Sequence, residues 1–163
     1  GAAVRVVRGA GGGASSSSSR PFAAVRAVRF VGAAGRGGGR LGAAFATGAA
    51  DGTLTLWDAR AGAAIGTLTA GEDGAASSPA HAGGVTALAV AAGGAPSTFS
   101  STTTLASVGA DGAARAWDLR SRRRAGPTPA RVGACPLTAV AWTPCGRGLA
   151  VGGADGRVCV VGL

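Results

Sequence analysis

The chain has 163 residues, a mass of 15.3 kDa and a formal net charge of +9. Its length is that of about one domain. All 16 basic residues are arginine, and the complete lack of lysine excludes a Schiff-base lysine and a phosphate-loop lysine. Its apolar runs are short and interrupted by Arg or Asp, so the sequence predicts no transmembrane helix.

The positive charge has two interpretations. It could attract a nucleic acid or another anionic partner, or it could reflect a GC-rich gene in which basic positions have become arginine. We favour the second, because lysine, asparagine, glutamine, tyrosine and methionine are all absent. Three cysteines without a Cys-x-x-Cys pair predict neither a disulfide framework nor a zinc site. This favours a reducing intracellular location, in the cytoplasm or nucleus, and no metal or cofactor is expected.

Taken in chain order, the predicted elements are all strands. Residues 3–8 could form one strand, followed by a Gly/Ser-rich loop to residue 19. Alternating or apolar runs bounded by turn residues then predict strands in three groups. They lie near residues 24–31, 41–48, 53–58 and 63–69, then near 85–90, 104–109, 113–118 and a weak 128–133, and finally near 137–143, 148–152 and 157–162.

The three groups are copies of one repeat. The pattern Asp-Gly-(x)4-Trp-Asp occurs at residues 51–58 and again, 60 residues later, at residues 111–118. A third copy begins at Asp155 and has Val161 in place of the tryptophan. Each Asp-Gly pair predicts a tight turn between antiparallel strands, because glycine accepts a positive φ. A His-Ala-Gly-Gly-Val-Thr segment beginning at His81 precedes the second copy.

These motifs resemble the WD40 β-propeller family over roughly residues 20–163. The resemblance implies an all-β fold with about three four-stranded antiparallel blades, near residues 24–69, 85–133 and 137–163, and residues 3–8 could belong to a preceding blade. Propellers have about four to eight blades, so the ring would be incomplete. We expect remaining blades to be missing from the chain, as the lack of methionine suggests. Ring completion by association is the alternative.

The resemblance also implies a structural role for several polar residues. In WD40 blades a His, a Ser or Thr, an Asp and a Trp form a buried hydrogen-bond chain. The second blade carries all four members, and the other blades keep some of them, with Pro21 and Gly133 at the histidine positions. The implied residues are His81, Ser107, Asp111 and Trp117 in the second blade, Thr47, Asp51 and Trp57 in the first, and Asp155 in the third.

Two arginine patterns suggest partner contacts. Trp-Asp-x-Arg ends two successive blades and is similar to the motif of WD40 substrate receptors of cullin–RING ubiquitin ligases, which would put Asp58, Arg60, Asp118 and Arg120 on an adaptor-facing edge. Arg122, Arg123 and Arg124, expected in a loop, could bind phosphate or an acidic partner. Residues 35–40 carry an RGG-type element that could do the same. Solvated loop charge is the simpler interpretation of the loop arginines.

The sequence therefore favours a non-enzymatic WD40 scaffold that mediates protein–protein interactions within a larger complex. No catalytic residues are predicted, because no acid–base pair or nucleophile–base pair is visible. The alternatives are a ubiquitin-ligase substrate receptor and an arginine-rich, nucleic-acid-associated propeller. Nucleic-acid binding is not favoured, since few aromatic residues accompany the arginines.

Overall fold

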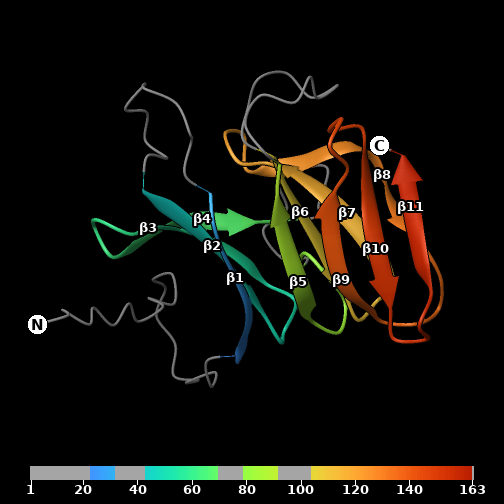
Figure 1. Ribbon diagram of the computed structural model, residues 1–163. Coiled ribbons are helices and arrows are strands. Elements are labelled where there is room, and N and C mark those ends of the chain that lie inside the picture. The colour runs from blue at the N-terminus through green and yellow to red at the C-terminus, as the bar shows by residue number, and fades with distance from the viewer. Residues whose placement is uncertain (1–22, 32–42, 70–78, 92–103, 163) are drawn as a thin grey trace, which may run out of the picture.

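The computed structural model describes residues 23–31, 43–69, 79–91 and 104–162 (Figure 1). Every regular element in these residues is a β-strand, and the strands form three antiparallel sheets. We call the sheets blades one, two and three in chain order. Blade one contains β1 (Val25–Phe30), β2 (Ala44–Ala49), β3 (Leu54–Asp58) and β4 (Ala63–Leu68). Blade two contains β5 (Val85–Val90), β6 (Thr104–Gly109), β7 (Ala113–Asp118) and β8 (Arg123–Arg131), and blade three contains β9 (Leu137–Trp142), β10 (Gly148–Gly153) and β11 (Val158–Gly162).

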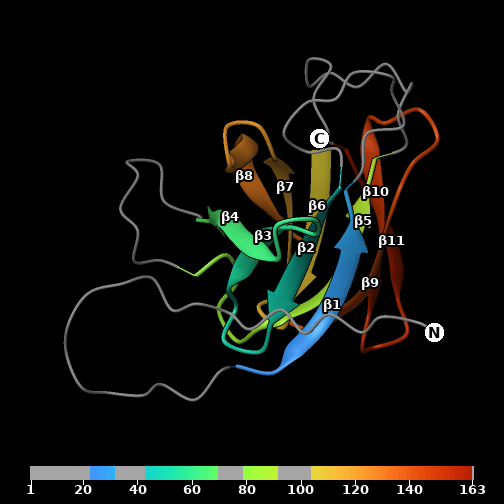
Figure 2. The same ribbon diagram turned by 90° about the vertical axis from the view of Figure 1, so that its left-hand side faces the viewer.

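Within each blade, strands adjacent in sequence are also adjacent in space, so every blade is a simple meander. The first strands of successive blades contact one another, β1 with β5 and β5 with β9. Figures 1 and 2 show the three blades side by side in chain order, as an open arc rather than a closed ring. No helix in the described ranges is long and apolar enough to cross a membrane.

The Asp-Gly turns give the blades their shared register. Gly52, Gly112 and Gly156 have φ values of 84°, 68° and 80°, a conformation that favours glycine. The preceding aspartate accepts a hydrogen bond from the backbone N–H two residues later in each turn, at 3.0 Å in blade one, 3.2 Å in blade two and 3.1 Å in blade three. A short polar side chain and a glycine thus produce the same turn three times.

Register also defines two ends for each blade. In blade two Val90 lies opposite Leu105, and Leu105 lies opposite Trp117. The end that contains these residues is the Trp end, and the end that contains the Asp-Gly turns is the Asp-Gly end. Equivalent pairings join Phe30, Phe45 and Trp57 in blade one.

Two apolar cores hold the blades together. The first lies between blades one and two and includes Leu54 and Leu56 from one side and Leu105 and Trp117 from the other. The second lies between blades two and three, where Ala106 and Ala114 meet residues such as Leu149. Each sheet therefore buries its apolar face against the next sheet, and the hydrophobic effect stabilises neighbouring blades jointly.

Most strands lie within a few residues of their expected positions, with one clear exception. The fourth strand of blade two is β8, Arg123–Arg131, rather than residues 128–133. The turn after Asp118 is short, and Asp118 pairs directly with Arg123. Arg123 and Arg124 are therefore in a strand, which corrects the expected loop. The expected strand at residues 3–8, the loop to residue 19 and residues 35–40 fall outside the described residues.

Candidate functional site

Blade two contains a continuous chain of four polar side chains. The indole Nε1 of Trp117 donates to Ser107 Oγ at 2.8 Å, and Ser107 Oγ lies 2.7 Å from His81 Nε2. The other ring nitrogen of His81, Nδ1, lies 2.9 Å from Asp111 Oδ1. Trp117, Ser107 and His81 are fully buried. Buried polar groups are costly without partners, so this chain of contacts satisfies groups that the fold removes from water.

The carboxylate determines the direction of the hydrogen bonds. An ionised Asp111 only accepts, so His81 Nδ1 carries the proton and donates to it. His81 Nε2 then accepts from the Ser107 hydroxyl, whose oxygen accepts in turn from Trp117. The chain thus runs in one direction, from the indole N–H to the carboxylate.

Arg115 is a fifth member that the sequence analysis missed. Its Nη1 donates to Asp111 Oδ2 at 2.8 Å. The same atom lies 2.7 Å from His81 Nδ1, and because both groups are donors in the tautomer described above, this second contact is a close approach and not a hydrogen bond. Two local signals point to it: Arg115 follows Asp111 by four residues, and it pairs with Ser107 across β6 and β7. The positive charge of this guanidinium disfavours protonation of the neighbouring imidazole.

The surroundings keep His81 neutral and Asp111 ionised. Burial lowers the pKa of His81, the hydrogen bond to Asp111 raises it, and the charge of Arg115 lowers it further, with a net decrease from 6.5. Burial raises the pKa of Asp111, but the hydrogen bonds and charges of His81 and Arg115 outweigh it and lower the pKa below 3.8. Both shifts favour the neutral-imidazole arrangement described above.

We expect stability to fall as the pH is lowered from about 7 to about 5. The folded pKa of His81 lies below its unfolded value of 6.5, so the unfolded chain binds the proton first. This contribution to stability is complete above pH 6.5 and is lost as the pH falls through the folded pKa. Urea unfolding at each pH measures it, and His81 is the only histidine. A His81→Asn variant should show a flat profile over this range; an unchanged slope would contradict the assignment.

The other blades make only parts of this chain. In blade one Trp57 Nε1 donates to Thr47 Oγ1 at 2.8 Å. Asp51 instead accepts from the backbone and hydroxyl of Thr53, at 3.0 and 2.7 Å. Asp155 in blade three caps its own turn and lies 3.7 Å from the Arg157 guanidinium. Pro21 lies outside the described residues.

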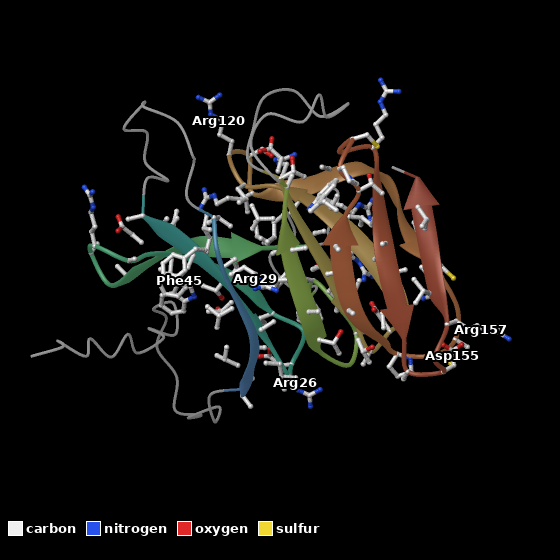
Figure 3. All side chains as sticks on the ribbon, viewed as in Figure 1. Arg26, Arg29, Phe45, Arg120, Asp155 and Arg157 are labelled. Carbon is white, nitrogen blue, oxygen red and sulfur yellow. The ribbon has the colours of Figure 1, made fainter. Side chains whose placement is uncertain are left out.

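The two Asp-x-Arg turns lie at the Trp end of adjacent blades. Asp58 Oδ1 accepts from the backbone N–H groups of Arg60 and Ala61, at 2.7 and 3.0 Å, and Asp118 Oδ1 accepts from Arg120 at 2.8 Å. These backbone hydrogen bonds, from Ala61 and then from Arg60, lower the pKa of Asp58. Both aspartates therefore shape their own turns, while Arg60 and Arg120 are exposed. Figure 3 shows Arg120 projecting away from the sheets.

The three consecutive arginines differ from one another. Arg122 has a positive φ of 58° and donates through Nη1 to the backbone oxygen of Ile65 at 3.1 Å, which links blade two to blade one. Arg123 and Arg124 pair with Asp118 and Trp117 across β7 and β8. Arg122 and Arg123 are exposed and Arg124 is half-buried. The three side chains therefore do not form the single loop patch that was expected.

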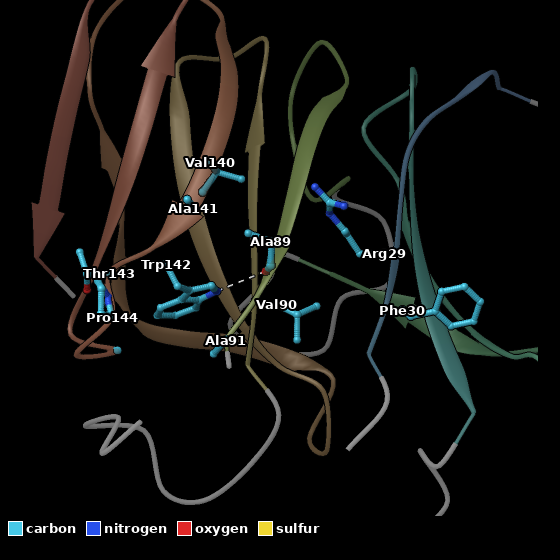
Figure 4. Close-up of a pocket in the computed structure, with 11 residues that line it drawn as sticks. Arg29, Phe30, Ala89, Val90, Ala91, Val140, Ala141, Trp142, Thr143 and Pro144 are labelled. Atoms are coloured by element: carbon cyan, nitrogen blue, oxygen red, sulfur yellow. Dashed lines mark hydrogen bonds between the residues drawn. The ribbon is translucent and has the colours of Figure 1, made fainter. Parts of the chain in front are cut away.

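A groove opens between the first strands of the three blades, toward the Trp end (Figure 4). Its volume is about 430 Å³, and Arg29 is the only charged residue among the described residues that line it. Arg29 Nε donates to Leu88 O at 3.0 Å, across blades one and two. On the opposite side Trp142 Nε1 donates to Ala89 O at 3.2 Å. The wall between them consists of small apolar residues such as Ala89 and Ala141.

The described part of the chain holds no cluster of metal-ligating side chains. No group of three or more His, Cys, Asp or Glu side chains there could hold a metal ion. The cysteines Cys135, Cys145 and Cys159 are free thiols.

The meandering blades, packed face to face around their first strands, define a β-propeller segment. The family model for the WD domain, G-beta repeat, matches residues 129–161, which span the end of β8 and most of blade three. No curated protein matches the chain. Over residues 129–161 the chain is similar to a WD40 repeat, and its three meandering sheets are consistent with a segment of a WD40 propeller. The match falls on the blade that has Val161 in place of tryptophan.

Proposed function

We propose that the chain is a protein-interaction scaffold that binds an acidic segment of a partner protein in the groove. WD40 domains generally serve as non-catalytic scaffolds that bind other proteins. The observation that supports this particular surface is the placement of Arg29 in an otherwise uncharged groove.

The chemistry of the groove defines the partner segment. Arg29 donates through its Nε to Leu88 O, and its two terminal nitrogens make no hydrogen bond or ion pair within the described residues. A guanidinium presents paired N–H donors that match a carboxylate. Trp142 and Val140 offer apolar surface close by (Figure 4). A segment with one Asp or Glu next to an apolar side chain fits both features.

Substitutions in the groove should reduce partner recovery in affinity purification with mass spectrometry. We expect Arg29→Ala to reduce recovery of the bound proteins about tenfold or more, since a charge-assisted pair in a partly closed groove is lost. Ala141→Glu should have a similar effect by repelling the acidic segment, and it leaves the Arg29 hydrogen bond in place. Arg157→Ala is the matched control, because Arg157 is 84% exposed and lies at the Asp-Gly end. Equal recovery by all variants would refute the groove as the binding surface.

The second candidate function, a ubiquitin-ligase substrate receptor, is supported by the two exposed arginines at equivalent turns of blades one and two. In the same purification, this role predicts that Arg60→Ala/Arg120→Ala loses a propeller-type adaptor while groove partners remain. A wild-type chain that never recovers an adaptor would exclude the role. Nucleic-acid binding stays a prediction, and no contact in the described residues supports it. The Arg122 guanidinium donates a hydrogen bond to the backbone oxygen of Ile65.

A further inference from the structure

The inner edge of blade two faces the groove. β5 is the end strand of its sheet, in the order β5-β6-β7-β8, so described strands pair with only one of its two edges. Ala91, directly after β5, donates its backbone N–H to Thr104 O of β6 at 3.0 Å. Peptide groups of neighbouring residues in an antiparallel strand point to opposite sides. The N–H and C=O of Val90 therefore point away from β6, along the unpaired edge.

A contact from blade one agrees with this orientation. Leu88 lies two residues before Val90, so its peptide groups share the same edge. Its carbonyl oxygen accepts from Arg29 Nε at 3.0 Å. The unpaired edge thus runs directly past the Arg29 guanidinium, where Leu88 O is already bonded. The next peptide groups along the edge are those of Val90, which lines the groove together with Arg29 (Figure 4).

The surroundings of this edge leave room for a second main chain. β5 contacts β1 on one side and β9 on the other, so the edge lies between two packed blades rather than at an end of the arc. The side chains beside it are small, and Ala89, Ala91 and Ala141 line the groove. Its volume of about 430 Å³ lies within the range of ligand pockets. Small side chains allow a backbone to approach the strand to pairing distance, which is about 4.8 Å.

Other polar side chains of the groove are already bonded within the chain. Trp142 Nε1 donates to Ala89 O at 3.2 Å, and Thr143 Oγ1 donates to Gly148 O at 3.0 Å. Among the described lining side chains, the terminal nitrogens of Arg29 are the donors that remain open to a partner. A bound segment therefore meets one cationic side chain beside an open strand edge.

We propose that the acidic segment binds as an extended strand that adds to the unpaired edge of β5. This inference rests on the proposed function, because it takes an acidic segment as the occupant of the groove. The main chain of the segment exchanges hydrogen bonds with the N–H and C=O of Val90, and a nearby carboxylate pairs with Arg29. Main-chain pairing supplies affinity, and the carboxylate supplies specificity. A helical segment does not fit, since its peptide groups already bond within the helix.

A modified peptide tests the main-chain contact. The probe is a fluorescein-labelled, C-terminally amidated pentapeptide with the sequence Thr-Val-Glu-Val-Thr, and its fluorescence anisotropy with the whole chain measures the dissociation constant. N-methylation of the three central amides should raise that constant about tenfold or more, because it removes the main-chain donors and keeps the glutamate. Glutamine in place of glutamate tests the Arg29 contact separately, and it should also weaken binding about tenfold.

Val90→Pro tests the same contact from the side of the protein. Proline lacks the N–H, and because this N–H points away from β6, the pairing of β5 within its own sheet is kept. We expect Val90→Pro to bind the probe about fivefold more weakly than Val90→Ala. Val90→Ala is the matched control, since it also shortens a side chain that packs on the core but keeps the N–H. Circular dichroism verifies folding, and the N-methylated probe tests the wild-type chain if Val90→Pro does not fold.

The two proposals fail in different ways. Weaker binding on N-methylation and in Val90→Pro supports strand addition. If Arg29→Ala and the glutamine peptide weaken binding while N-methylation has no effect, an acidic segment occupies the groove without pairing to β5, and only the strand addition is overturned. A parent probe that does not bind, or that binds equally well to Arg29→Ala, would overturn the proposed function as well.

Discussion

Replacing Trp117 with alanine should lower the free energy of unfolding by about 3–5 kcal/mol, the range for truncating a buried large aromatic residue. Trp117 is fully buried and packs in the core between blades one and two. The substitution leaves a cavity and also removes the donor to Ser107 Oγ at 2.8 Å. Urea denaturation followed by circular dichroism measures the change.

The matched control is Trp57→Ala. Trp57 has the same repeat position and an equivalent hydrogen bond to Thr47 at 2.8 Å, but it is only half-buried. Its loss should therefore cost clearly less than the loss of Trp117. Trp117→Phe separates the two contributions, since it keeps most of the apolar contact and should cost about 1 kcal/mol for the hydrogen bond. Equal effects of the two alanine variants would contradict the burial of Trp117.

Replacing Asp111 with alanine should cost about 3–5 kcal/mol, because it leaves the charge of Arg115 without its buried partner. The side chain of Asp111 is 8% exposed and that of Arg115 is 12% exposed. Asp111 also accepts the proton of His81 Nδ1, and the Nε of Arg115 is already buried without a hydrogen-bond partner in the described residues. Chemical denaturation of the variant measures the loss.

Asp51→Ala is the control for the turn itself. Asp51 occupies the same position of its Asp-Gly turn but is exposed, and within the described residues its side-chain hydrogen bonds go to Thr53. Its removal should cost about 1 kcal/mol. In Asp111→Ala/Arg115→Leu the uncompensated charge is also removed, so part of the stability should return. If Asp111→Ala and Asp51→Ala were equally destabilising, the buried ionic contacts would contribute nothing beyond the turn.

The predictable part of the fold rests on local chemistry. The Asp-Gly turns and the alternating strands depend on interactions between residues about ten positions apart or fewer. Their pattern in the sequence is therefore sufficient to predict three antiparallel sheets. The pairs Trp117–Ser107 and Trp57–Thr47 follow from the same register, since each spans one hairpin. The late start expected for β8 was wrong because a short polar turn leaves no apolar signal at Arg123.

The groove and the role of Arg115, which the sequence analysis did not predict, depend on contacts between distant segments. Arg29 reaches Leu88, 59 residues away, and Trp142 reaches Ala89, 53 residues away, so the groove exists only once three blades are packed together. The local spacing places Arg115 near Asp111, but its role arises because His81, from a distant segment, meets Asp111 beside it. A single sequence gives the identity of each side chain but does not show which side chains the fold brings together.

The sequence by itself thus determined the repeat, its turns and the alternation of the strands, because those depend on backbone preferences of neighbouring residues. The tertiary structure alone decided which sides of the repeats are covered. Leu54 and Leu56 are buried, while Val158 and Val160, at the same repeat positions, are more than 70% exposed. The physical reason is that a side chain on the face of a blade is buried only where another blade packs against that face.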